Sequence, residues 1–209
     1  MEIFIIIITS ILMGSIPTAY LLVKKFYGID ITSNGTGNVG AMNSARVTSS
    51  SIIGIAVFLL DFAKGLAAVY IASLILPDSF YAGAVALIVS VTSHCFNPWL
   101  KFKGGRGLAT AAGGALMFSP LLLVLWVILW VIAYLFRKNI HFGNIAATVL
   151  SLALVWSSGD IINKYTYPSA EHVLLFKIAG SILFLIILIK HWEPIKSIFG
   201  KEGIKIKKD

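Results

Sequence analysis

Long apolar runs, separated by short charged or proline-containing segments, most constrain what this 209-residue chain can fold into. A straight helical crossing of a bilayer needs about 20 consecutive apolar residues, because each residue advances the helix by only about 1.5 Å. Charged residues make up 12% of the chain, against about 25% in soluble domains. We therefore expect an all-α, polytopic transmembrane helical bundle of about seven spans, some of them short. The candidate runs lie near 3–23, 52–76, 80–96, 107–117, 119–136, 144–160 and 172–190.

Two proline-containing breaks set the number of runs. Pro77-Asp78 separates the second run from the third, and Ser119-Pro120 divides the fourth from the fifth. Proline lacks a backbone N–H and disfavours helical geometry in the residue before it, so each break is expected to end a helix. Several runs are shorter than a straight crossing requires, which leaves five or six spans as the alternative to seven.

The positions of Lys and Arg favour seven spans and give an expected orientation. With the N-terminus outside and seven crossings, every Lys and Arg except Lys64, Lys164 and Lys177 falls on the cytoplasmic side. Basic residues are enriched in cytoplasmic loops of membrane proteins. Without the break at Ser119-Pro120, Arg137-Lys138 would face outside instead. We therefore expect an outer N-terminus and a cytoplasmic C-terminus.

The first apolar run is expected to stay in place as a span. A signal peptide begins with positive residues, whereas Glu2 precedes this run and Lys24-Lys25 follow it. The sequence shows no internal repeat and no separate soluble domain, so we expect a single integral-membrane domain over 1–193. A short basic cytoplasmic tail over 194–209 would follow, and its lysines favour contact with anionic lipid by about 1 kcal/mol each.

Composition excludes several partners and chemistries. The formal net charge is +8, but the basic residues lie between apolar runs and not along one soluble face, so nucleic acid is not an expected partner. Cys95 is the only cysteine, which excludes an internal disulfide. The four histidines have no metal-ligand spacing with Cys95 or the carboxylates, so the sequence predicts no metal site.

A glycine-rich segment over 34–46 interrupts the apolar pattern after the first run. Its glycines match the letters of a dinucleotide-binding fingerprint, but membrane helices flank them where that fingerprint needs a strand–helix unit. The remaining interpretation is an anion site, with backbone N–H groups in a concavity and a bidentate fork from Arg46. An ordinary turn with a topology-setting arginine is the alternative, and this segment alone leaves the two open. Its glycines and hydrogen-bonding side chains are Gly35, Gly37, Gly40, Thr36, Asn38 and Asn43.

A second glycine-rich segment, Phe102-Lys-Gly-Gly-Arg-Gly-Leu-Ala-Thr110, precedes a stretch of small residues. If a helix begins near Gly107, its N-terminal N–H groups face the same side as the neighbouring cations. The Walker A pattern is absent. Topology-setting charge explains the cations but not the glycines among them, so the sequence favours an anion site here. The cations and glycines are Lys101, Lys103, Arg106, Gly104, Gly105 and Gly107.

Asp61 and Lys64 are charged residues one helical turn apart within the second run. Each costs roughly 2.5–3.5 kcal/mol near the bilayer centre, which favours pairing or a polar cavity. A structural ion pair and a place beside the anion site are equally compatible with this spacing. His94 and His191 border cytoplasmic segments, where an imidazole can accept a proton at neutral pH. A hydrogen-bonded histidine without a catalytic role is the alternative for each.

These segments resemble those of the bacterial membrane glycerol-3-phosphate acyltransferases that use acyl phosphate as donor. The resemblance extends over most of the chain, and the two glycine-rich segments carry its most specific part. The matching motifs are Gly14–Tyr20, Gly28–Ile31, Gly35–Asn43 with Arg46, Asp61-x-x-Lys64-Gly65, and His94 with Phe102–Thr110.

The sequence departs from the family pattern at five places. Thr36 replaces a serine and keeps the hydroxyl, and Arg106 replaces a common lysine and keeps the charge with a different geometry. Pro98 lies one place later than the usual proline. A Ser-rich stretch of the family becomes Asn139-Ile-His-Phe-Gly-Asn144, and Pro194 stands where the family has an asparagine three residues after the histidine.

The resemblance implies transfer of a fatty acyl group from acyl phosphate to the 1-hydroxyl of glycerol 3-phosphate, giving lysophosphatidic acid and phosphate. It implies a multi-pass protein of the bacterial inner membrane, an active site on the cytoplasmic face, and no cofactor. The expected partners are the two substrates, the bilayer and a soluble enzyme that produces acyl phosphate. No Gly-x-Ser-x-Gly elbow occurs in the sequence, and a substrate-assisted route, in which the acceptor's phosphate helps remove the hydroxyl proton, would need none.

The resemblance also implies roles for particular residues. The second segment would bind glycerol phosphate, the first would bind and polarise the acyl phosphate, and the two histidines would orient groups or assist proton transfer. The expected catalytic residues are Thr36, Asn38, Arg46, His94 and His191. The expected substrate-binding residues are Gly35, Gly37, Gly40, Asn43, Lys64, Lys103, Gly104, Gly105, Arg106 and Gly107.

Two other functions remain as alternatives. A small anion transporter can also use paired glycine-rich loops and broken helices, although its site would lie near mid-membrane and repeats would be expected. A paralogue that binds lipid phosphate with altered or lost acyltransferase activity is the second, suggested by Pro194 and His141.

Overall fold

The structure is a computed structural model in which residues 1–199 are described. Within that range every regular element is helical. The helices are α1 (Glu2–Ser15), α2 (Thr18–Tyr27), α3 (Ala41–Thr48), α4 (Ser51–Ile75), α5 (Phe80–Cys95), α6 (Leu108–Phe118), α7 (Pro120–Arg137), α8 (Ile140–Asn163), α9 (Val173–Lys190) and α10 (Trp192–Phe199), with a 3₁₀ turn at Pro98–Leu100.

The membrane-spanning elements follow the predicted apolar runs. Among the described residues six segments are long and apolar enough to cross a bilayer, and Leu108–Phe118 is a shorter apolar helix. The all-α membrane bundle is therefore confirmed. The six longer segments are Glu2–Tyr27, Ser51–Ile75, Phe80–Leu100, Pro120–Arg137, Ile140–Asn163 and Val173–Lys190.

Both predicted breaks end helices. The α4 helix ends at Ile75 and α5 begins at Phe80, where the Ser79 side chain accepts a hydrogen bond from the first turn. The α6 helix ends at Phe118, and Pro120 is the first residue of α7. Proline is tolerated at this position because the first helical N–H has no intrahelical partner.

Three local features differ from the predicted runs. The first run is divided into α1 and α2 at Ile16-Pro17, because proline cannot donate the hydrogen bond that would continue α1. The first glycine-rich segment contains a short helix, α3. The α8 helix begins at Ile140, four residues before the predicted run, because the Asn139 side chain accepts hydrogen bonds from the N–H groups of His141 and Phe142.

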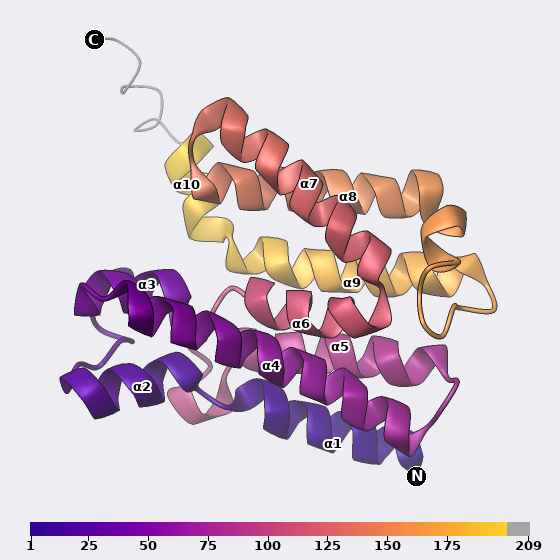
Figure 1. The fold of residues 1–209 in the computed structure, drawn as a ribbon, viewed down its shortest axis with the longest axis horizontal. Helices are drawn as coiled ribbons and strands as arrows, with labels where there is room; N and C mark the ends of the chain where they lie inside the picture. The colour runs from indigo at the N-terminus through magenta and orange to yellow at the C-terminus, as the bar shows by residue number, and fades with distance from the viewer. Residues whose placement is uncertain (200–209) are drawn as a thin grey trace.

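The helices form two groups that meet at α5, α6 and α9. In Figure 1, α1, α2 and α5 lie below α6, α4 slopes downward past it, and α7, α8 and α9 lie above it. The α4 helix packs on α6 and α1 on α5 in the first group, whereas α7 packs on α8 and α8 on α9 in the second. The α5–α9 and α6–α7 contacts join the groups.

Glycines bring α4 and α6 into close contact. A Cβ on Gly65 would collide with the Thr110 carbonyl oxygen, and a Cβ on Gly113 would collide with the Phe62 carbonyl oxygen. Small residues at such positions let membrane helices pack backbone against backbone, which gains van der Waals contact where no hydrophobic effect operates between helices. This packing fixes the N-terminus of α6 relative to α4.

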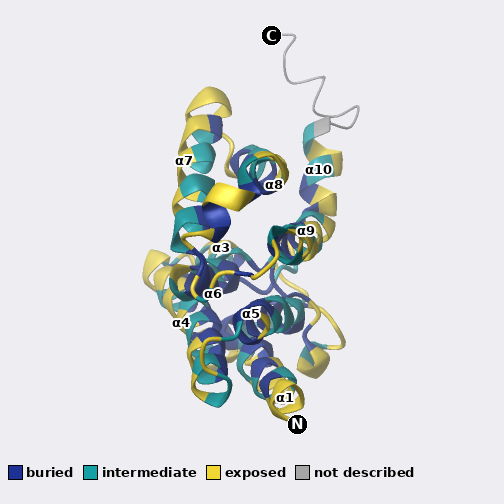
Figure 2. Cartoon of the chain, turned by 90° about the vertical axis from the view of Figure 1, so that its right-hand side faces the viewer, coloured by how far each residue is buried: buried dark blue, intermediate teal, exposed yellow. Residues whose placement is uncertain are grey.

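Burial follows the pattern of a membrane bundle. Buried residues face the helix interfaces and exposed residues cover the outside of the bundle (Figure 2). Several outward-facing side chains are large and apolar, for example Ile52 at 78% and Phe136 at 80% exposed. Such exposure would be unfavourable in water but costs nothing against lipid tails, so the exposed apolar belt agrees with an integral membrane protein.

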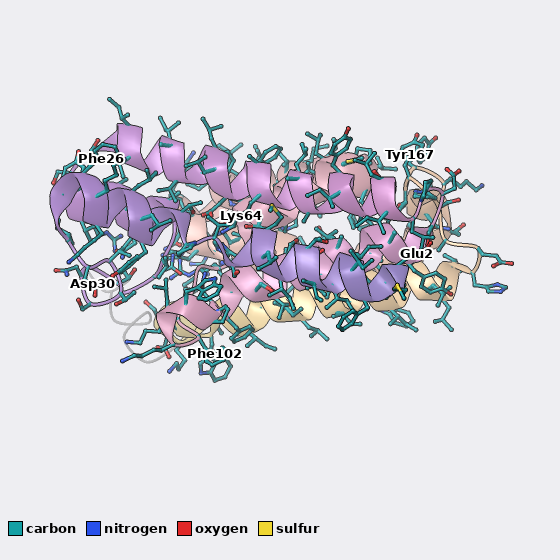
Figure 3. All side chains as sticks on the ribbon, turned by 90° about the horizontal axis from the view of Figure 1, so that it is seen from below. Glu2, Phe26, Asp30, Lys64, Phe102 and Tyr167 are labelled. Atoms are coloured by element: carbon teal, nitrogen blue, oxygen red, sulfur yellow. The ribbon has the colours of Figure 1, made fainter. Side chains whose placement is uncertain are left out.

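The two ends of the bundle carry different segments. Figure 3 places Asp30 and Phe102, from the two glycine-rich segments, at one end and Glu2 and Tyr167 at the other, with Lys64 between them. Figure 1 places α2, α3 and α10 at the first of these ends. The predicted division between a domain over 1–193 and a tail falls within α10, and residues 200–209 of that tail lie outside the described residues.

Candidate active site

Local hydrogen bonds fold the turn that leads into the first glycine-rich segment. The Asp30 carboxylate accepts hydrogen bonds from the backbone N–H and hydroxyl of Thr32, at 2.9 and 2.7 Å. These two bonds are the main reason that the pKa of Asp30 is below its ordinary value. Gly35 and Gly37 have φ of +62° and +69°, in the left-handed region that favours glycine. The segment therefore turns tightly before α3.

Asn43 of α3 stabilises this turn through two side-chain hydrogen bonds. Its side-chain N–H donates to the Asn34 carbonyl at 3.0 Å, and its side-chain oxygen accepts from the Thr36 N–H at 3.0 Å. The residue is buried. Asn43 therefore shapes the turn that presents Thr36. It also lines the pocket described below, and substrate binding by Asn43 stays a prediction.

The second glycine-rich segment lies against the end of α5. The Gly105 N–H donates to the His94 carbonyl at 3.2 Å. A Cβ on Gly104 would collide with that carbonyl, and a Cβ on Gly105 would collide with the His94 ring. Gly107, with φ of +83°, precedes the first residue of α6. These glycines are therefore needed for close backbone contact, and the helix begins where the sequence predicts it.

One pocket brings the two segments together, and we refer to it as the arginine pocket. Its empty volume is about 220 Å³. Arg46 comes from the first segment and Arg106 from the second, and no carboxylate lines the pocket. The lining residues are Thr36, Asn38, Met42, Asn43, Arg46, Arg106 and His141.

The charges of the arginine pocket are uncompensated by the protein. Within residues 1–199 neither Arg46 nor Arg106 forms an ion pair with a carboxylate. Arg106 is half-buried, and burial together with the nearby Arg46 charge lowers the pKa of its guanidinium. Arg106 donates a hydrogen bond from Nη1 to His141 Nδ1 at 3.2 Å. Cations gathered without a counter-charge in a partly buried site favour an anionic ligand.

A separate buried cluster lies at the break between α1 and α2, and we refer to Asp61, Lys64, Thr18 and His94 as the buried cluster. Lys64 Nζ lies 2.8 Å from Asp61 Oδ1, and the same carboxylate oxygen accepts a hydrogen bond from Thr18. His94 Nδ1 lies 3.6 Å from this oxygen. All four residues are buried. The predicted pairing of Asp61 with Lys64 is therefore present.

The buried cluster also satisfies the broken end of α1. Lys64 donates to the Ile16 carbonyl at 2.9 Å, and Asn97 donates to the Ser15 carbonyl at 2.7 Å. These carbonyls have no helical partner because Pro17 interrupts the chain of backbone hydrogen bonds. A small pocket of about 160 Å³ borders the cluster and is lined in part by Gly104 and Gly105. Lys64 thus uses two of its three donors inside the protein.

His191, at the end of α9, is held by its neighbours. Its Nδ1 lies 2.8 Å from the Ile187 carbonyl, which can only accept, so Nδ1 carries the proton. Its Nε2 lies 3.5 Å from the side-chain nitrogen of Asn144, whose oxygen accepts from Trp130 Nε1 at 2.7 Å. Burial, together with the charges of Arg106 and His141, lowers the pKa of His191 to about 4, although its hydrogen bond to the Ile187 carbonyl opposes this shift. His191 is therefore neutral at pH 7.

The predicted site residues fall into three places. The arginine pocket receives part of the set, and the buried cluster with its small pocket receives His94, Lys64, Gly104 and Gly105. His191 contacts Asn144, and Lys103 is exposed and near enough to Asp30 for its charge to contribute to lowering the pKa of that carboxyl. The predicted residues that line the arginine pocket are Thr36, Asn38, Asn43, Arg46 and Arg106.

Two residues of the site are absent from the sequence-based prediction. His141 and Asn144 lie three residues apart at the start of α8 and contact Arg106 and His191. That spacing puts them on one helix face. A polar pair at i and i+3 beside an apolar run is a signal for this arrangement, but the sequence predicts a run that begins only at Asn144 and so leaves His141 outside the helix.

No cluster of three or more metal-ligating side chains occurs among the described residues. Cys95 is fully buried, so its thiol is not accessible to a substrate.

Sequence and structure comparisons agree on one family. The sequence model of glycerol-3-phosphate acyltransferase matches residues 4–201. A glycerol-3-phosphate acyltransferase of Wolbachia pipientis wMel is 34% identical over 97% of each chain. One of Pelagibacter ubique (strain HTCC1062) is 32% identical over 99% of each chain.

Two crystal structures of PlsY (YgiH), an integral membrane glycerol 3-phosphate acyltransferase, have the same fold. The glycerol 3-phosphate form superposes on this chain with a TM-score of 0.78 at 26% identity, and the match covers 99% of this chain and 100% of the PlsY chain. Its lysophosphatidic acid form superposes with a TM-score of 0.75 at 27% identity and covers 95% of this chain and 92% of that one. The chain belongs to the glycerol-3-phosphate acyltransferase family and is an integral membrane acyltransferase of the PlsY type.

Proposed function

We propose that this acyltransferase transfers a fatty acyl group from acyl phosphate to the 1-hydroxyl of glycerol 3-phosphate and releases lysophosphatidic acid and inorganic phosphate. The convergence of Arg46 and Arg106 on one pocket without a carboxylate is the observation that carries this proposal. Both substrates bear phosphate groups, and two guanidinium forks are suited to phosphate oxygens. The glycerol 3-phosphate and lysophosphatidic acid forms of PlsY support the choice of acceptor and product.

An apolar groove beside the arginine pocket supports a donor with a long hydrocarbon chain. The groove lies between α6, α7 and α9 and has an empty volume of about 400 Å³. Its lining includes Leu108, two residues after Arg106, and Ile187, whose carbonyl binds His191. An acyl chain in this groove would place its phosphate-bearing end near Arg106. Its lining residues are Leu108, Ala111, Ala112, Ala115, Leu122, Leu123, Trp126, Leu183, Phe184 and Ile187.

The reaction needs no enzyme nucleophile, because an acyl phosphate is already activated. The 1-hydroxyl oxygen forms a bond to the acyl carbon, the bond from that carbon to the phosphate oxygen breaks, and the phosphate leaves with the electron pair. The hydroxyl proton passes to a phosphate oxygen of the acceptor. In this scheme the protein contributes positioning and stabilisation of the developing negative charge.

We assign roles to the predicted residues on this basis. Arg46, Thr36 and Asn38 face the acyl phosphate, with Gly35, Gly37 and Gly40 shaping the turn. Arg106 and the N-terminus of α6 after Gly107 face glycerol 3-phosphate, with Lys103 at the rim. His94, His191 and Lys64 act from behind the pocket, since each is buried and engaged with protein groups.

We propose that the arginine pocket faces the cytoplasm of a bacterial cell, in the inner membrane. Arg46 lies in α3, at the end of the bundle that carries α2, α3 and α10 (Figure 1), and Lys103 follows Phe102, which Figure 3 labels at the same end. The positive-inside rule favours that end as the cytoplasmic one. A water-soluble acceptor from the cytosol would then reach the pocket directly, as would a soluble enzyme that delivers acyl phosphate.

The test supplies purified protein with palmitoyl phosphate and glycerol 3-phosphate and quantifies both products. The proposal predicts lysophosphatidic acid and phosphate in equal amounts without coenzyme A. Product formed only from palmitoyl coenzyme A or palmitoyl acyl carrier protein would overturn the assigned donor. Uptake of glycerol 3-phosphate into protein-containing vesicles without product would favour the transporter, and phosphate binding without either would favour a paralogue that has lost activity.

A further inference from the structure

His141 is the one ionisable side chain of the arginine pocket that the proposed mechanism leaves unused. It is the second residue of α8, and its N–H donates to the Asn139 side chain at 2.9 Å, which fixes the start of the helix. Its ring lines the pocket together with Arg46 and Arg106. The residue is half-buried, so the ring is held in place and remains open to the pocket.

The contact with Arg106 determines which ring nitrogen of His141 carries the proton. The Arg106 Nη1 atom can only donate, and it lies 3.2 Å from His141 Nδ1. Nδ1 must therefore accept, and a neutral imidazole then carries its single proton on Nε2.

We propose that His141 is a further phosphate-binding residue of this enzyme, which orients Arg106 through Nδ1 and donates its Nε2–H to a phosphate oxygen in the arginine pocket. The inference rests on the proposed function for the identity of the phosphate, which belongs either to glycerol 3-phosphate or to the acyl phosphate. The claim that His141 binds a phosphate group does not depend on the proposed function.

The composition of the pocket supports this assignment. Arg46, Arg106 and His141 present N–H donors, and no acidic side chain lines the pocket to accept them. An acceptor with several oxygens and negative charge is needed to satisfy such a set, and a phosphate group has both. The His141 bond occupies one donor of Arg106 and leaves four for a ligand.

The test separates the two ring nitrogens with two isosteric variants. His141→Asn keeps a polar group where Nδ1 lies, next to Arg106, and loses the donor at Nε2. His141→Gln keeps a donor near Nε2 and loses the acceptor for Arg106. Kinetics are measured with glycerol 3-phosphate and palmitoyl phosphate varied separately, so that the KM that rises identifies which phosphate His141 binds.

We expect His141→Asn to raise the KM for one of the two substrates by roughly 10-fold or more, because the variant loses one hydrogen bond to a charged group. His141→Gln is expected to raise the same KM less and to lower kcat, because Arg106 is no longer oriented. His172→Asn is the matched control. His172 is exposed at the other end of the bundle, before α9, and this variant should match the wild type.

A second measurement uses inorganic phosphate as the probe and does not require turnover. Phosphate and glycerol 3-phosphate should raise the melting temperature of the wild type and of His172→Asn, and should raise that of His141→Asn less. Wild-type KM values and phosphate stabilisation in both His141 variants would overturn the inference. The inference would also be overturned if the His141 variants lost activity only in proportion to a lower melting temperature measured without ligand.

The two proposals fail in different ways. If the wild type makes no product from palmitoyl phosphate but its stabilisation by phosphate depends on His141, the inference stands and the donor assignment fails. If the wild type makes product and both His141 variants keep its KM values, the donor assignment stands and the inference fails.

Discussion

The buried cluster and the arginine pocket are both polar and both lie near the second glycine-rich segment, but they differ in how their charges are satisfied. In the buried cluster Lys64 is paired with Asp61 and donates to the Ile16 carbonyl. In the arginine pocket Arg46 and Arg106 have no carboxylate partner among the described residues. A closed set of partners indicates a structural role, whereas an open set of donors indicates a ligand site.

The comparison shows that polar residues can lie close to an active site and still have a structural role. The buried cluster fastens the interrupted end of α1 to α4 and α5, and through His94 it supports Gly105. The arginine pocket draws on α3, α8 and the second segment instead. We therefore expect mutations in the two regions to separate, with stability affected in one and turnover in the other.

The largest expected effect is a loss of stability on breaking the buried ion pair. Asp61→Ala leaves the Lys64 ammonium buried without its counter-charge, which typically costs about 3–5 kcal/mol. Thermal unfolding of the detergent-solubilised variant should show a markedly lower melting temperature. The double variant Asp61→Leu/Lys64→Met removes both charges and should recover part of this loss. A single variant as stable as the wild type would remove the structural role assigned to the buried cluster.

The next effect separates turnover from stability in the arginine pocket. Arg46→Ala should lower kcat/KM by roughly 10²–10³-fold, as does removal of one donor that stabilises developing charge. The melting temperature should stay near that of the wild type, since Arg46 is exposed and makes no ion pair within residues 1–199. Steady-state kinetics with palmitoyl phosphate and a melting curve on the same sample check both parts. A stable variant with wild-type turnover would contradict the role proposed for Arg46.

A smaller effect concerns the way in which titration of His191 makes the stability of the protein depend on pH. Its pKa is about 4 in the folded protein against 6.5 ordinarily, so the unfolded state binds more protons between these values. Stability should therefore fall as pH falls from about 6.5 toward 4, by at most roughly 1.4 kcal/mol per pH unit. His191→Asn keeps a donor for Ile187 and cannot titrate, so its stability should fall less steeply. Equal pH dependence in the two proteins would show that His191 does not titrate as described.

The membrane fold was largely readable from the sequence, because apolar runs and prolines act locally. The ends of α4, α5, α6 and α7 fall at or beside the predicted breaks. Pro17 divides the first run by the same physics, but apolar residues on both sides of it make the run read as continuous along the sequence. The short helix α3 was missed because glycines and polar residues mask its start.

The site was readable only in part, because many of its contacts join residues distant in sequence. The glycines and cations indicated that 34–46 and 102–107 bind an anion, and the structure brings Arg46 and Arg106 to one pocket. The sequence could not show that Asn43 bonds to the backbone of its own segment or that Lys64 reaches the Ile16 carbonyl. The contact between Arg106 and His141 depends on how α8 packs, and no pattern along the chain reports it.

The central claim is that Arg46 and Arg106, from two separate segments, act together in one pocket that holds both phosphate-bearing substrates. A double-mutant cycle on kcat/KM with Arg46→Ala, Arg106→Ala and the double variant tests it most directly, using a radiolabelled acceptor to follow slow turnover. Groups that act together give strongly non-additive effects. We predict that the double variant loses much less activity than the product of the two single losses. Losses that multiply would show that the arginines act independently and would contradict a shared site.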